Sequence, residues 1–157
     1  MKPNPFIDDY RLNWCFRYLR EANADYECSK LVKNRNTCIN LCSTALRKAQ
    51  TAVLYALGEP TQVYNSIIAV LEGRVEADDP LIRTLTSMER FIRELIDGAP
   101  SIPRESLIRM TGEHISVAEK LVRKILEAYE RDERLNRPFH IHIRLGMRTL
   151  TCSDGAG

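Results

Sequence analysis

The residues best suited to chemistry are Arg109 and His114, which are separated by four residues. A histidine can act as the general base on a ribose 2′-hydroxyl, because its pKa lies near neutrality. An arginine can stabilise the pentacoordinate phosphate with its planar, permanently charged guanidinium. The pair therefore predicts the catalytic site of a metal-independent ribonuclease. The competing interpretation is a solvated arginine and a surface or capping histidine.

Similar pairs occur in the tail, where Arg134 precedes His140 and Arg137 precedes His142. Arginine is abundant there, so the excess over chance is small. Basic residues of the second helical region and of the tail are also predicted to bind nucleic acid, because clustered cations attract a polyanion. These residues are Arg47, Lys48, Arg137, His140, His142 and Arg144.

Other motifs that hold metals or phosphates are absent. The sequence has no HExxH, no CxxC pair and no ExxH pair on facing helices, and no GxxxxGK[ST] or GxGxxG loop. His140 and His142 can chelate a metal, but a solvent-facing basic strand is favoured because no third ligand lies nearby. We therefore predict no metal and no cofactor. A nucleotide would be bound by basic side chains or helix N-termini.

Composition sets the protein class. The 157 residues, 44 % of them apolar, suffice for one domain with one core. Apolar runs are too short for a membrane span and no signal-peptide pattern occurs. The five cysteines form no CxxC pair, which favours a reduced, cytoplasmic protein in which they pack as small apolar residues. Cys38 and Cys42, four residues apart, are expected in the core rather than in redox chemistry.

The net charge of +2 hides a segregation along the chain. Residues 11–50 carry a balance of +5, residues 59–98 one of −4, and residues 131–157 one of +2. This asymmetry suits a polyanionic ligand, or head-to-tail contact between opposite surfaces. Near-neutrality of the whole chain therefore does not argue against RNA.

Apolar residues recur at helical spacing through most of the chain. A first helix is predicted over about residues 8–33, and its inward face is predicted to carry Leu12, Phe16, Leu19 and Tyr26. A second helix is predicted to start at a cap, Asn36 or Thr37, and to end at Gly58. Its many small residues would let neighbours approach closely, so we expect it at the centre of a bundle.

Three further helical regions follow. One covers about residues 60–71, and the next is begun by Asp79-Pro80 and ended by Gly98. The last covers about residues 104–134, and Gly112 within it predicts two helices or one kinked helix. The expected fold is all-α, an antiparallel up-down bundle of four to five helices.

The tail changes its periodicity. From Phe139 to Leu145 apolar and basic residues alternate, which predicts a strand. Such a strand would pair with its copy in a dimer, lie against the bundle, or form an extended arm. The last dozen residues are expected to be loose. We therefore divide the chain into a bundle over residues 1–135 and an extended arm over residues 136–157.

Two stretches carry a family resemblance. Residues 17–27, RYLREANADYE, and residues 45–58, ALRKAQTAVLYALG, resemble the first two helices of the HEPN family (higher eukaryotes and prokaryotes nucleotide-binding). The last long helix, from Ala118 to Tyr129, is also of the family's kind. The resemblance covers about residues 15–130. It implies a helical bundle that forms a homodimer and binds RNA or a nucleotide.

The resemblance also bears on catalysis. Active members carry an arginine, usually a polar residue, three further residues and a histidine, a spacing that Arg109 and His114 match. Met110 and Gly112 depart from the pattern. The implied roles include a toxin of toxin–antitoxin type, a partner of a small nucleotidyltransferase or of an antitoxin protein, and a non-catalytic RNA-associated module.

Three hypotheses remain open. The first is a HEPN-like dimer that binds RNA or a nucleotide and cleaves RNA through Arg109 and His114. The second is a non-catalytic helical interaction module, an antitoxin-like or scaffold subunit. The third is a general nucleic-acid binder that uses the basic stretches and whose affinity falls steeply with salt.

Overall fold

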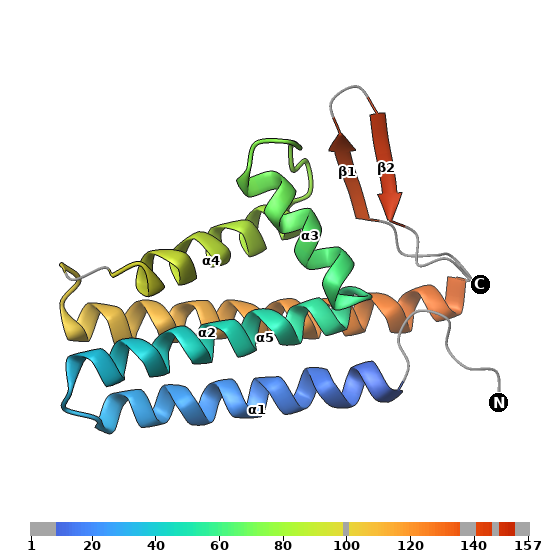
Figure 1. The fold of residues 1–157 in the computed structure, drawn as a ribbon. Coiled ribbons are helices and arrows are strands. Elements are labelled where there is room, and N and C mark those ends of the chain that lie inside the picture. Colours follow the sequence, from blue (N-terminus) through green and yellow to red (C-terminus); the bar gives the residue numbers. More distant parts are fainter. Residues whose placement is uncertain (1–8, 99–100, 136–140, 146–147, 153–157) are drawn as a thin grey trace.

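A computed structural model describes residues 9–98, 101–135, 141–145 and 148–152, and side chains as far as residue 131. Within these residues the chain forms five α-helices and a two-stranded hairpin (Figure 1). They are α1 (Asp9–Leu31), α2 (Arg35–Leu57), α3 (Pro60–Leu71), α4 (Pro80–Ile96), α5 (Arg104–Leu135), β1 (Ile141–Leu145) and β2 (Arg148–Cys152). The predicted all-α bundle is confirmed.

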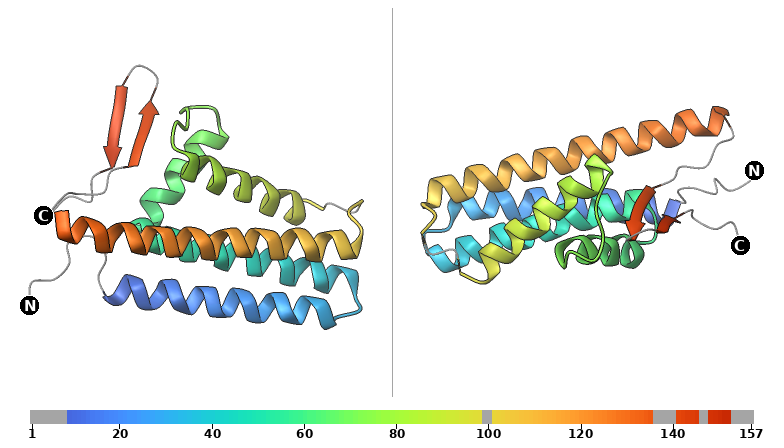
Figure 2. Two further views of the ribbon diagram at one scale, coloured as in Figure 1. Left: turned by 180° about the vertical axis from the view of Figure 1, so that it is seen from behind. Right: turned by 90° about the horizontal axis from the view of Figure 1, so that it is seen from above.

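The long helices alternate in direction along the chain. α1 runs opposite to α2, and α4 runs opposite to α5, while the short α3 crosses between α2 and α4 (Figures 1 and 2). α2 contacts each of the other four helices. Its buried face is accordingly the widest, and it includes Ala45, Ala49, Ala52 and Ala56, which are fully buried. The prediction that the second helix is central is confirmed.

Capping residues set where the helices begin. The side chain of Asn34 accepts a hydrogen bond from the backbone N–H of Thr37 at 3.0 Å, so α2 starts earlier than the predicted caps Asn36 or Thr37. Those predicted caps were wrong because Asn34 already has the extended backbone of an N-cap. The predicted start of α4 is confirmed, since Asp79 accepts from the N–H of Leu81 at 2.7 Å.

The inward face of α1 differs from the prediction. Its fully buried residues are Cys15, Ala22 and Ser29, spaced seven apart, whereas the side chain of Phe16 is 46 % exposed. Small residues allow α1 to lie close against α2, so the larger side chains flank the contact instead of filling it. The predicted face is thus confirmed for Leu19 and Tyr26, which are partly buried against the core, and is wrong for Phe16.

α5 is one continuous helix through Gly112. A Cβ atom built on Gly112 would overlap the side-chain hydroxyl of Tyr26 and would lie 2.8 Å from its Cζ atom. The missing side chain at this position is thus what allows Tyr26 of α1 to contact α5. Of the two predicted outcomes, two helices is wrong, because packing supports the helix across the glycine.

Arginines close one end of the bundle. One terminal amino group of Arg104, in the first turn of α5, donates to the carbonyl oxygens of Lys30 and Val32, both at 2.9 Å. These carbonyls lie at or just after the C-terminal end of α1, where a cation interacts favourably with the helix dipole. Arg35, the first residue of α2, donates to the carbonyl of Ile102 at 2.7 Å. The chain connections at this end are therefore held by side chain to backbone hydrogen bonds.

The tail is a hairpin. β1 pairs antiparallel with β2, with Ile141 opposite Cys152 and Leu145 opposite Arg148. The prediction of a strand is confirmed for residues 141–145. Its partner is β2 of the same chain, an arrangement that none of the three predicted alternatives includes. Of the last dozen residues, Arg148–Cys152 form β2 and pair with β1, and the others lie outside the described residues.

Gly112 gives a test of helix packing. Alanine normally stabilises a helix interior by about 1 kcal/mol relative to glycine. Overlap with Tyr26 should reverse this, so Gly112→Ala should lower the free energy of unfolding by about 1 kcal/mol or more. In a Tyr26→Ala background the same change should raise it. Urea unfolding measures both, and equal stabilisation in the two backgrounds would show that the contact does not constrain residue 112.

Candidate nucleic-acid interface

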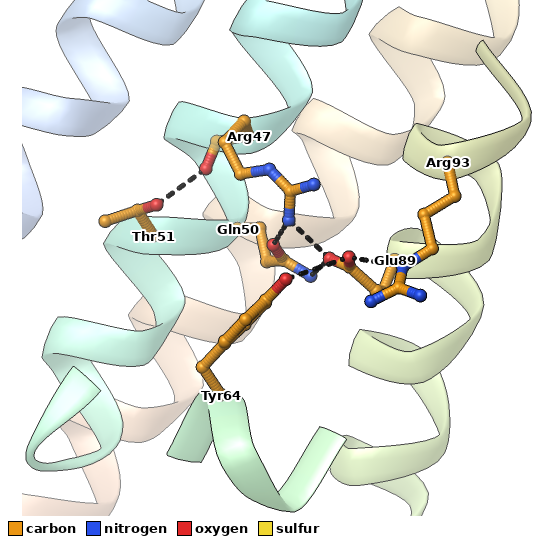
Figure 3. A network of polar contacts seen from close by, with 6 residues as sticks. All are labelled: Arg47, Gln50, Thr51, Tyr64, Glu89 and Arg93. Atoms are coloured by element: carbon orange, nitrogen blue, oxygen red, sulfur yellow. Dashed lines mark hydrogen bonds and ion pairs between the residues drawn. The ribbon is translucent and has the colours of Figure 1, made fainter. Parts of the chain in front are cut away.

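A buried carboxylate joins three helices. The side chain of Glu89, on α4, is fully enclosed. Its Oε2 atom accepts hydrogen bonds from Nη1 of Arg47 and, at 2.9 Å, from Nε2 of Gln50, both on α2. Its Oε1 atom accepts from the hydroxyl of Tyr64 on α3 at 3.1 Å and from Nε of Arg93 at 3.0 Å. Figure 3 shows the four donors converging on the one carboxylate.

Hydrogen bonds determine the charge state of Glu89. Burial by itself would raise the pKa of this carboxyl group. Hydrogen bonds from Arg47, Gln50 and Arg93 oppose that effect and together hold the pKa below its usual value. Glu89 is therefore ionised at neutral pH. Two guanidinium groups and one carboxylate leave this cluster with one net positive charge.

Both arginines reach the surface from this cluster. The side chain of Arg47 is 36 % exposed and that of Arg93 is 50 % exposed. Arg93 donates to Glu89 through Nε and also hydrogen-bonds the side chain of Tyr64 (Figure 3). Arg47 uses Nη1 for both Glu89 and Gln50. The outer N–H groups of two fixed guanidinium forks are the donors that a phosphate prefers.

Lys48, the second predicted cation of α2, lies on the side of α1. Its Nζ atom forms ion pairs with Asp25 at 2.7 Å and with Glu21 at 3.4 Å. Arg17 also pairs with Glu21, at 2.8 Å, so two cations face two carboxylates and the local charge is balanced. The structure thus places Arg47 and Lys48 in different surroundings, and only Arg47 belongs to a cluster with net positive charge.

The predicted catalytic pair does not converge within one chain. A spacing of five residues turns the helix through about 140°, so Arg109 and His114 project from different sides of α5. The exposed Arg109 donates to Glu113 at 2.7 Å. The His114 ring instead stacks on Phe91 of α4, with ring centroids 4.7 Å apart. The two side chains therefore have different partners.

The histidine nevertheless has a defined tautomer. Its Nδ1 atom lies 2.8 Å from the carbonyl oxygen of Met110. A carbonyl only accepts, so Nδ1 carries the proton and Nε2 of the neutral ring is an acceptor. The tautomer of His114 is thus set by a carbonyl of its own helix, whereas the exposed Arg109 is paired with Glu113.

Of the four tail residues predicted to bind nucleic acid, Arg137 and His140 lie outside the described residues. His142 and Arg144 are in β1, where the register sets them opposite Thr151 and Thr149. Alternation along a strand places His142 and Arg144 on the same face of the hairpin.

The cysteines behave largely as predicted. Cys15, Cys38 and Cys42 are fully buried, and burial raises the pKa of Cys15 to about 11 and also raises that of Cys38. The thiols of Cys15 and Cys38 are therefore protonated and unreactive. Among the cysteines whose side chains the structure describes, Cys28 is the exception, because it is exposed on α1. Among the described residues, no three His, Cys, Asp or Glu side chains are grouped to hold a metal ion.

Sequence reasoning missed four members of the cluster, namely Gln50, Tyr64, Glu89 and Arg93. A signal was present, since Gln50 and Glu89 each interrupt an apolar helical stripe. A polar residue at a core position needs a buried partner. The partner's identity depends on how α2 faces α4, which the stripe alone does not specify.

Comparison of the chain with known protein families, with curated proteins and with solved structures finds no match. Among the described residues, no helix combines the length and apolar character that a membrane crossing requires.

The charge of Glu89 makes stability depend on pH. Its pKa is lower in the folded chain than in the unfolded chain, so the unfolded chain takes up protons first on acidification. The stabilisation is complete above about pH 4.3, the usual pKa of glutamate, and is lost as the pH falls through the folded value.

We therefore expect Glu89→Gln to lower the free energy of unfolding at pH 7 by about 1–3 kcal/mol. The difference from wild type should shrink towards pH 3. Chemical unfolding across this range is the measurement, with Glu94→Gln, at an exposed position of α4, as the control that retains the wild-type profile. A difference that stays constant with pH would refute the role of the ionised carboxylate.

Proposed function

We propose that this chain is a HEPN-like helical bundle that binds RNA through Arg47 and Arg93. The observation that carries the proposal is the fixing of two partly exposed guanidinium groups by the single buried carboxylate of Glu89. RNA, rather than a small anion alone, is favoured by the segregation of basic residues into the first helix pair and the tail.

Fixed arginines bind phosphate efficiently for two reasons. Their side chains lose little conformational freedom on binding, because Glu89 already restrains both. Their outer N–H groups match the geometry of phosphate oxygens, and the cluster keeps a net positive charge. Contacts of this kind release counterions from the nucleic acid, so the affinity should decline with salt.

The HEPN resemblance supports the same substrate class independently. It rests on the two stretches in the first helix pair, and Arg47 lies in the second of these. A nucleotide-binding family and a fixed arginine pair lead to the same class of ligand. The alternative, a non-catalytic protein-interaction module that is an antitoxin-like or scaffold subunit, requires neither the family resemblance nor the arginine pair.

Arg93 gives the first test of binding. Arg93→Lys keeps a positive charge beside Glu89 but removes the fork, so the dissociation constant for a labelled single-stranded RNA should rise by about tenfold. Arg93→Ala should also reduce the salt slope by about one unit. Fluorescence anisotropy at several salt concentrations measures both, and circular dichroism verifies the fold.

Arg83→Ala is the matched control, because Arg83 is an exposed cation of the same helix. It should change the affinity little. Equal losses of RNA affinity for Arg83→Ala and Arg93→Ala would show that binding reflects general charge attraction rather than the fixed guanidinium groups. Absence of RNA binding by the wild-type chain would favour the protein-interaction module instead.

Cleavage of RNA is a separate proposal that needs two chains. Arg109 and His114 project from different sides of α5, so one complete site would combine Arg109 of one protomer with His114 of its partner. His114 already presents Nε2 as an acceptor, and Arg109 would exchange Glu113 for a phosphate. The proposed homodimer is therefore required for catalysis.

Complementation tests this arrangement. Arg109→Ala and His114→Ala should each abolish RNA cleavage in EDTA, because each removes one role from every site. An equal mixture that has exchanged subunits should recover roughly a quarter of the wild-type activity, since half of the dimers are mixed and each has one intact site. No recovery in verified mixed dimers would contradict a shared site, and cleavage that survives both substitutions would rule out this pair.

A further inference from the structure

An aromatic strip runs along the seam between α1 and α2. Tyr10, Trp14 and Tyr18 are spaced four residues apart on α1, so they lie on one side of that helix. Tyr55 of α2 completes the strip, with its ring centroid 6.2 Å from Trp14 and 5.7 Å from Tyr18. None of these four side chains was singled out by the catalytic or basic motifs of the sequence.

The rings differ in their mutual orientation. Trp14 and Tyr55 are inclined by 21°, and Tyr18 and Tyr55 by 22°. These nearly parallel rings are laterally displaced, because direct face-to-face contact would bring their centroids closer than about 6 Å. Tyr10 instead contacts Trp14 edge-on, with the two ring planes inclined by 68°. Tyr10, at the end of the strip, is 64 % exposed.

A cation lies against this strip. The guanidinium carbon of Arg17 is 4.9 Å from the centroid of the Trp14 ring, and the Arg17 side chain is 57 % exposed. Aromatic rings with an adjoining arginine are the elements on which unpaired bases stack in proteins that bind single-stranded nucleic acid. Stacking of this kind tolerates any sequence, because every base has a π face.

The strip and the arginine cluster lie on different sides of α2. Tyr55 and Arg47 are eight residues apart, which turns the helix through about 80°. Tyr55 packs against Trp14 and Tyr18 of α1, whereas Arg47 contacts Glu89 of α4. A strand that stacks on the rings must therefore pass around α2 to reach Arg47, which lies about 12 Å away along the axis.

We infer that the strip of Tyr10, Trp14, Tyr18 and Tyr55 is a stacking platform for unpaired bases, so the ligand is single-stranded rather than duplex RNA. The inference rests on the proposed RNA-binding function and specifies its substrate class. In a duplex the bases stack on one another, and their faces are not available to the protein.

Trp14 supplies a direct probe, because it is the sole tryptophan of the chain. A 12-nucleotide oligouridylate should quench its fluorescence with the same dissociation constant that anisotropy of the end-labelled oligonucleotide reports. A duplex of the same length should bind at least about fivefold more weakly, since each lost base stack is worth about 1 kcal/mol or more.

Two variants on α1 separate stacking from general surface effects. Tyr10→Ala removes an exposed ring of the strip and should weaken oligouridylate binding by about fivefold or more. Phe16→Ala removes an exposed ring on the side of α1 that faces α5, and it should bind as wild type does. Both positions are exposed, so neither substitution should affect folding.

The outcomes distinguish this inference from the function on which it rests. Anisotropy that saturates without a change in Trp14 fluorescence, equal affinity for the duplex, or wild-type affinity of Tyr10→Ala would each overturn the platform and leave the arginine site standing. No anisotropy change with any RNA would overturn the proposed function itself.

Discussion

The structure depends on neutralising one carboxylate in its interior. Glu89 is fully enclosed, and an ionised group can stay there only if charged and polar partners replace the lost water. The chain provides them from three helices, so the same contacts that satisfy Glu89 also fix α3 and α4 against α2. The same contacts affect the surface, because they hold Arg47 and Arg93 in place while both side chains remain partly exposed.

A second constraint is the close approach of α1 and α2. Small side chains such as Cys15 and Ala22 form the contact, so aromatic residues are displaced to its edges. On one edge they form the strip around Trp14, and on the other Tyr26 reaches the space left by Gly112. Packing by small residues therefore decides both how α5 approaches α1 and which side chains line the edge of the α1–α2 contact.

Local signals explain which features the sequence could predict. Asp79, Pro80 and Gly98 bound α4 through capping and backbone geometry, which depend on neighbours in sequence. The role of Glu89 depends on α2 lying against α4, so it could not be read from the stripe of α4. Arg47 was selected for its charge alone, without its partner. The strand at Ile141–Leu145 followed from its alternation, but its partner β2 lacked an equally clear pattern.

We propose that RNA binds this chain at the guanidinium groups that Glu89 fixes. The most direct measurement follows the arginine Nε–H and tryptophan indole resonances by ¹⁵N–¹H correlation NMR during titration with oligouridylate. We expect the largest shifts at Arg47, Arg93 and Trp14, with Arg83 and Arg104 nearly unchanged. Shifts centred on Arg109 and the N-terminal half of α5, with the Glu89 cluster unaffected, would contradict it.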